Sequence, residues 1–143
     1  MDTFDELDRY LAVDYSPNLW SDDAIDRATE LLDGLSEADW HRLERTWKDR
    51  PIAWQVRLAD AVFGSDKPRV IDLLCQMLKS PEVEVAIAAA ESLEAKDYVW
   101  TPDASLRDVL EKLLDSVEGG EQHAIKVLLG RIPTENNTSS STQ

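Results

Sequence analysis

Apolar residues recur every three or four positions along most of this chain. This spacing places them on one face of a helix. The pattern is interrupted at glycine and proline residues, which end one helix or begin the next. Between these interruptions the chain is predicted to form eight short helices in four pairs, over about residues 2–33, 36–64, 66–95 and 103–131.

The stretch RPIAWQVRLADAVFG, residues 50–64, is apolar on two sides of its predicted helix. Helical spacing divides these residues into two sets, with Trp54, Leu58 and Ala61 on one side and Ile52, Val56, Ala59 and Phe63 on the other. We expect such a helix to lie between two neighbours, with one side packed against each of them.

Residues 36–64 and 66–95 match in character at an offset of 30 residues. The aligned positions include Trp40 with Val70, Leu43 with Leu73, Pro51 with Pro81, Ala59 with Ala89, and Phe63 with Leu93. A unit of two helices cannot bury its apolar face alone, so it stacks on neighbouring units. We therefore expect an all-α fold built as an α-solenoid of about four antiparallel helix pairs, with a compact helical bundle as the alternative.

The segment VIDLLCQMLKSPEVEVAIAAAESLEAK, residues 70–96, resembles a HEAT repeat. It has an apolar helix, a Ser-Pro break, and a second helix with Val85, Ala89 and Leu93 four residues apart. The likeness covers residues 36–95 and implies a right-handed solenoid. HEAT repeats often carry Arg after the Val of the second helix, whereas this chain has Ala86 there, so the exact register of the repeat stays open.

The net charge of −14 limits the class of partner. Nucleic acids and anionic membranes require clustered Lys and Arg, so neither is expected to bind. A protein with a basic surface is the natural electrostatic complement. The alternative is that the acidity serves solubility alone. The acidity is concentrated in the first 49 residues, which contain 14 acidic and 5 basic side chains.

We predict that the partner-binding residues lie toward this acidic end. Asp22, Asp23, Asp26 and Glu30 are spaced to share one helix face, where they could hold a basic partner or simply form a solvated surface. Tryptophan is a favoured anchor in protein interfaces. Trp40 and Trp47 fit a core stripe, whereas Trp20 and Trp54 are the better candidates for exposed anchors. Arg57 is included in the predicted interface.

The sequence contains few groups that could support catalysis. Its only cysteine, Cys75, excludes an internal disulfide, and His41 and His123 lack a second ligand at metal-binding spacing. It contains no phosphate-binding loop and no nucleophile-elbow motif. We therefore expect no enzymatic activity, no cofactor and no metal.

The chain is expected to be one cytoplasmic domain over residues 1–132, followed by a disordered polar tail over 133–143. The first residues are acidic and lack the apolar core of a signal peptide, and no apolar run is long enough to span a membrane.

In size, acidity and HEAT-like pattern the chain resembles immunity proteins of bacterial toxin–immunity systems. That resemblance implies a protein that neutralises a cognate toxin by covering its active site or substrate surface. The alternative is a HEAT-type scaffold or adaptor subunit without a toxin partner. A HEAT-like DNA glycosylase is disfavoured because it needs a basic groove.

Overall fold

The computed structural model describes residues 3–13, 16, 19–20, 24–65, 69–95 and 104–132. Every regular element within these ranges is helical, which confirms the all-α prediction. The eight α-helices are α1 (Thr3–Ala12), α3 (Ile25–Asp33), α4 (Glu37–Thr46), α5 (Ile52–Val62), α6 (Arg69–Leu78), α7 (Val83–Glu94), α8 (Arg107–Asp115) and α9 (Gln122–Arg131). Short 3₁₀ helices occupy η2 (Trp47–Asp49), η3 (Ala104–Leu106) and η4 (Gly119–Glu121).

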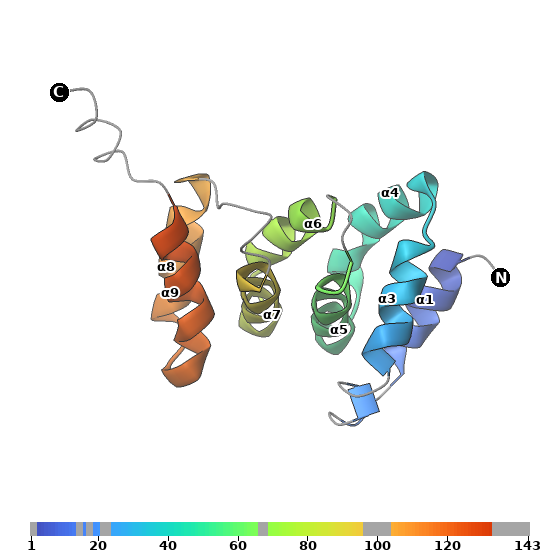
Figure 1. The fold of residues 1–143 in the computed structure, drawn as a ribbon, viewed down its shortest axis with the longest axis horizontal. Coiled ribbons are helices and arrows are strands. Elements are labelled where there is room, and N and C mark those ends of the chain that lie inside the picture. Colours follow the sequence, from blue (N-terminus) through green and yellow to red (C-terminus); the bar gives the residue numbers. More distant parts are fainter. Residues whose placement is uncertain are drawn as a thin grey trace.

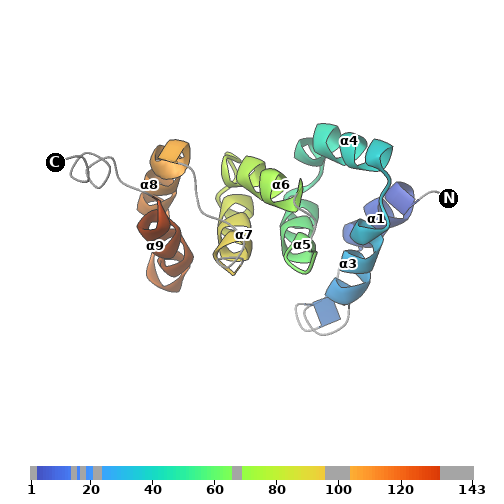
Figure 2. The same cartoon turned by 45° about the horizontal axis from the view of Figure 1, so that its top comes forward.

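Each predicted pair contains two of these helices, and the pairs follow one another through space in chain order (Figure 1). The second helices of the pairs form a continuous layer, because α5 packs against α3 and α7, and α7 packs against α9. Helices α4 and α6 lie along one side of this layer (Figure 2). The predicted tail, residues 133–143, lies outside the described residues.

The pair formed by α4 and α5 is less regular than the others. Helices α6 and α7 pack closely along each other, as do α8 and α9, and α1 and α3. The backbone of α4 instead approaches α1, and α5 also reaches α1 directly. The four pairs are therefore not equivalent copies of one arrangement.

The turns that begin the helices are built by short polar contacts. Ser36 and Asp39 form a capping box at the start of α4, in which the Ser36 Oγ accepts from the Asp39 N–H at 3.1 Å and the Asp39 Oδ2 accepts from the Ser36 N–H at 3.1 Å. Before α5, the buried Gln55 side chain donates its Nε2 to the carbonyl oxygen of Arg50 at 2.7 Å. Before α7, the Ser80 Oγ accepts from the Glu82 N–H at 3.0 Å.

Helix α7 lies at the centre of the core. All six side chains from Val85 to Ala90 are buried, and the four alanines among them allow α5, α6 and α9 to approach closely. Hydroxyl groups also link the second helices, since the Ser92 Oγ donates to the Ala59 carbonyl at 2.8 Å and the Thr29 Oγ1 donates to the Ala61 carbonyl at 2.8 Å. Helix α5 is therefore held from both sides by its neighbours.

Helix α5 is apolar and buried on two sides only in its middle. Leu58, Ala59 and Ala61 are fully buried there, as expected. Ile52 and Phe63 are 37% and 47% exposed, which differs from the prediction that this whole side packs against a neighbour. These two residues lie at the ends of the helix, where α3 and α7 do not cover them completely.

None of the helices in the described ranges has both the length and the apolar character needed to cross a membrane.

Candidate functional site

The two tryptophans predicted as exposed anchors are both buried. Trp20 is 8% exposed and its Nε1 donates to the Oδ2 of Asp60, on α5, at 3.1 Å. Trp54 is 2% exposed and its Nε1 donates to the carbonyl oxygen of Asp8, on α1, at 3.1 Å. The prediction of exposure is wrong because each indole N–H has a partner on another helix, which allows the ring to be buried.

Trp20 nevertheless borders a surface groove together with Arg57. The groove has a volume of about 460 Å³ and is lined by Trp20, Ile52, Ala53, Val56, Arg57, Asp60 and Glu84. Arg57 is half-buried, and its Nη1 donates to the carbonyl oxygen of Leu11 at 2.8 Å. The structure thus brings two of the predicted residues together and adds two carboxylates, Asp60 and Glu84, that the sequence analysis did not select.

The predicted acidic cluster is described only in part. Asp22 and Asp23 lie outside the described residues, whereas Asp26 and Glu30 are exposed on α3. Glu30 accepts from the Nη1 of Arg27 at 3.1 Å, so its charge is partly balanced within the fold.

Other acidic side chains of the N-terminal half also pair with arginines that are distant in the sequence. The shortest N–O distances are 2.9 Å for Arg27–Glu6, 3.4 Å for Arg42–Asp5, 2.8 Å for Arg50–Asp8 and 2.6 Å for Arg69–Glu37. The hydrogen bond and charge of Arg69 hold the pKa of Glu37 below its usual value. Much of the acidity noted in the sequence is therefore balanced within the fold rather than left for a partner.

Three of these guanidinium groups also lie over aromatic rings. The distances from guanidinium carbon to ring centroid are 4.3 Å for Arg42 over Phe4, 5.6 Å for Arg50 over Trp54 and 5.2 Å for Arg69 over Trp40. Each arginine thus contacts both an aromatic face and a carboxylate, which suits its flat, delocalised charge.

A second group of carboxylates remains unbalanced. We call it the carboxylate row: Asp60 on α5, Glu91 and Glu94 on α7, and Glu121 in η4. Burial raises the pKa of Asp60. The hydrogen bond from Trp20 lowers this pKa, but by less than burial raises it. Burial also raises the pKa of Glu91, and the negative charges of Asp60, Glu121 and Glu94 raise it further. Among the described residues, no Lys or Arg forms an ion pair with any member of the row.

The sequence did contain a signal for this row. Asp60 and Glu91 lie 31 positions apart near the ends of α5 and α7, so they occupy similar places in successive units. Glu121 instead precedes the first residue of α9. The sequence analysis used this repeat to align apolar positions only, and it sought the partner-binding carboxylates where acidic residues were most frequent.

The remaining candidate residues are separate from the groove and the row. His41 is exposed on α4, with its Nε2 3.6 Å from Glu37 and its Nδ1 3.7 Å from Glu44. Cys75 is half-buried on α6. Over the part of the chain that the structure describes, no three His, Cys, Asp or Glu side chains are grouped so that they could hold a metal ion.

Comparison with models of known protein families, with curated proteins and with solved structures gave no match to this chain.

Proposed function

We propose that this chain is a protein-binding module, and most concretely an immunity protein that neutralises a cognate bacterial toxin. In this proposal the helix pairs form a HEAT-like, right-handed α-solenoid, and the layer of second helices presents the binding surface. The proposal is supported by the succession of pairs in chain order and by the continuous contacts from α3 through α5 and α7 to α9.

The observation that carries the proposal is the contrast between two groups of acidic residues. Near the N-terminus, Asp5, Glu6 and Asp8 pair with arginines that are distant in the sequence. In the carboxylate row no such pairing is present among the described residues, and the pKa of Glu91 is raised first by burial and then by the negative charges of Asp60, Glu121 and Glu94. A folded protein gains nothing from repulsion among these charges by itself, whereas a basic partner would remove it.

The mechanism would combine electrostatic attraction of the toxin with steric blocking of its substrate surface. Lys and Arg side chains with which a toxin holds an anionic substrate would contact the carboxylate row. The neighbouring groove contains the half-buried Val56 and Arg57. It would receive apolar and polar side chains of the toxin that lie next to these Lys and Arg side chains. Opposite charges would speed the encounter, and the bound chain would then block access to the toxin's substrate surface.

The experiment begins with co-purification of the tagged chain from its host at low salt and identification of the retained protein by mass spectrometry. That protein is then expressed with and without the chain, and cell growth is measured. An immunity function predicts that the retained protein alone stops growth and that the chain restores it. A retained protein without toxicity would instead support the scaffold or adaptor alternative.

Charge reversal then tests the surface. We expect the double variant Glu91→Lys and Glu121→Lys to raise the Kd for this partner by at least about tenfold and to reduce its salt dependence. The matched control is the double variant Glu111→Lys and Asp115→Lys, which reverses two exposed carboxylates at α8, in the other layer of helices. If both double variants raised the Kd for the partner equally, or if neither raised it, the result would contradict the role of the carboxylate row.

A further inference from the structure

The turns within the helix pairs form an edge that carries two adjoining grooves. The first groove, of about 690 Å³, lies between the segment from η2 to the start of α5 and the turn between α6 and α7. The second, of about 300 Å³, lies between that same turn and α8. Lys79, Ser80 and Pro81 line both grooves, so the two adjoin at this turn.

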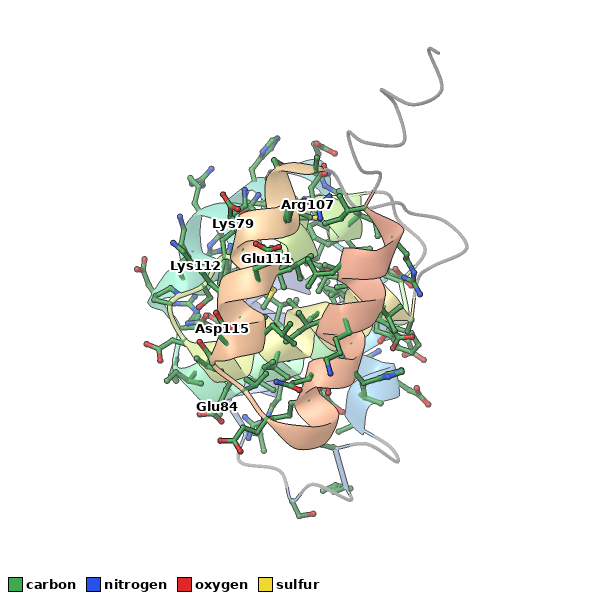
Figure 3. All side chains as sticks on the ribbon, turned by 90° about the vertical axis from the view of Figure 1, so that its left-hand side faces the viewer. Lys79, Glu84, Arg107, Glu111, Lys112 and Asp115 are labelled. Atoms are coloured by element: carbon green, nitrogen blue, oxygen red, sulfur yellow. The ribbon has the colours of Figure 1, made fainter. Side chains whose placement is uncertain are left out.

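Lysines are repeated along this edge. Lys48 lines the first groove, Lys79 lines both, and Lys112 lines the second. We call these three residues the basic edge. All three are exposed, and within the described ranges none of them forms an ion pair. Figure 3 shows Lys79 and Lys112 on the same flank of the molecule, with Glu84 well away from them.

Few acidic side chains oppose these lysines. Glu82 is the one carboxylate among the described residues that line the two grooves. Arg50 adds a further positive charge to the first groove, although it is paired with Asp8. Glu111 and Asp115 lie on the same helix as Lys112 (Figure 3). Neither of them lines the second groove. The edge is therefore locally basic in a chain whose net charge is −14.

Each groove also contains an exposed apolar side chain beside a proline. Ile52, 37% exposed, follows Pro51 in the first groove, and Val83, 41% exposed, follows shortly after Pro81 in the second. Both side chains lie at the start of a second helix, Ile52 in α5 and Val83 in α7. Each groove thus combines exposed ammonium groups with an exposed apolar side chain.

We propose that the basic edge binds an extended acidic segment of a partner protein, in which Asp or Glu residues alternate with apolar residues. The acidic side chains contact Lys48, Lys79 and Lys112, while the apolar ones pack on Ile52 and Val83. Charge complementarity selects this occupant, because the rest of the chain is acidic and would repel such a segment. The first groove adjoins the groove that contains Asp60, since Ile52 lines both, but Lys48, Lys79 and Lys112 line only the edge. The proposal does not depend on the function proposed above.

The test is an NMR titration of the ¹⁵N-labelled chain at low salt with a synthetic peptide. The peptide is extended, about 12 residues long and alternates Glu with Leu or Pro, which is long enough to pass both grooves. We expect shifts confined to amides near residues 48–52, 79–83 and 109–116. The matching peptide with Gln in place of each Glu should bind at least about fivefold more weakly.

Two charge-reversal variants separate this edge from general attraction. Lys79→Glu changes a residue that lines both grooves. It should raise the Kd for the acidic peptide at least about fivefold. Lys126→Glu makes the same change in charge at an exposed site on α9 that lines neither groove. This variant should bind the acidic peptide as tightly as the unaltered chain does. Circular dichroism shows whether both variants remain folded.

Three results would overturn the proposal. One is the absence of peptide-induced shifts at the edge, and another is equal weakening by Lys79→Glu and Lys126→Glu. The third is concentration-dependent self-association in sedimentation that Lys79→Glu abolishes, because the edge would then bind a second copy of this chain.

Discussion

At the scale of single residues, Asp60 is subject to opposing influences. It is half-buried on α5, which disfavours its charge, and it accepts a hydrogen bond from Trp20, which favours that charge. Burial is the larger of the two and raises the pKa. An ionised Asp60 therefore reduces the stability of the free protein while it anchors the buried indole ring.

This balance predicts a pH-dependent effect of the variant Asp60→Asn, which keeps an acceptor for Trp20 and removes the charge. A carboxyl with a raised folded-state pKa contributes stability below its unfolded pKa, and that contribution is lost as the pH rises through the folded value. The free energy of unfolding of Asp60→Asn should therefore exceed that of the unaltered protein by an amount that grows as the pH rises from the unfolded-state pKa to the folded-state pKa of Asp60. Above the folded-state pKa this difference should stay constant. Urea unfolding of both proteins across acid to neutral pH measures it.

The matched control is Asp26→Asn, an exposed carboxylate on α3. It makes the same Asp-to-Asn change at a site without the burial of Asp60, so it separates the effect of burial from that of the substitution itself. A constant difference between Asp60→Asn and the unaltered protein would contradict a raised pKa at this site.

At the scale of elements, α7 is defined by the small size of its side chains. Ala86, Ala88, Ala89 and Ala90 are all buried, and α7 packs closely on α5, α6 and α9. The Ser92 hydroxyl reaches a carbonyl of α5 at 2.8 Å, a contact that requires the helices to stay close together. The spacing between the second helices therefore depends on alanine at these positions.

We expect Ala89→Leu to lower the free energy of unfolding by about 1–3 kcal/mol, because a larger side chain at a fully buried site pushes α7 away from its neighbours. Chemical denaturation measures the change. Ala38→Leu, at an exposed position of α4, is the control and should change stability by less than about 0.5 kcal/mol. Similar effects of the two substitutions would show that the packing at Ala89 is not tight.

At the scale of the whole molecule, the inner second helices have neighbours on both sides and the outer helices do not. Helix α5 packs between α3 and α7, and α7 between α5 and α9, whereas α8 contacts mainly α9. In a stacked arrangement, stability is carried by contacts between adjacent units.

Hydrogen exchange should follow this order. Amides of α5 and α7 are expected to exchange slowest, and those of α1 and α8 to exchange faster through opening of the ends. Exchange measured by NMR under native conditions checks the order residue by residue. Equal protection in all helices would point to one cooperative unit, as in a compact bundle, rather than a solenoid.

The helices could be predicted from the sequence because their signals are local. Apolar spacing, the Ser36 cap and the breaks at Pro51 and Pro81 each act within a few residues of the chain. The arrangement of charges could not be predicted this way, because partners such as Arg50 and Asp8 are far apart in the sequence. The burial of Trp20 and Trp54 likewise depends on acceptors distant in the sequence, Asp60 and the Asp8 carbonyl.

The proposed binding at the carboxylate row would depend on the acidity of the surroundings. In the free protein, burial makes Asp60 and Glu91 hold their protons more tightly than isolated carboxyls do, and the neighbouring carboxylates add to this effect at Glu91. A cationic surface placed over them would favour the ionised forms, so protons would be expelled as the complex forms. Association would then tighten as the medium becomes less acidic and loosen under acid stress.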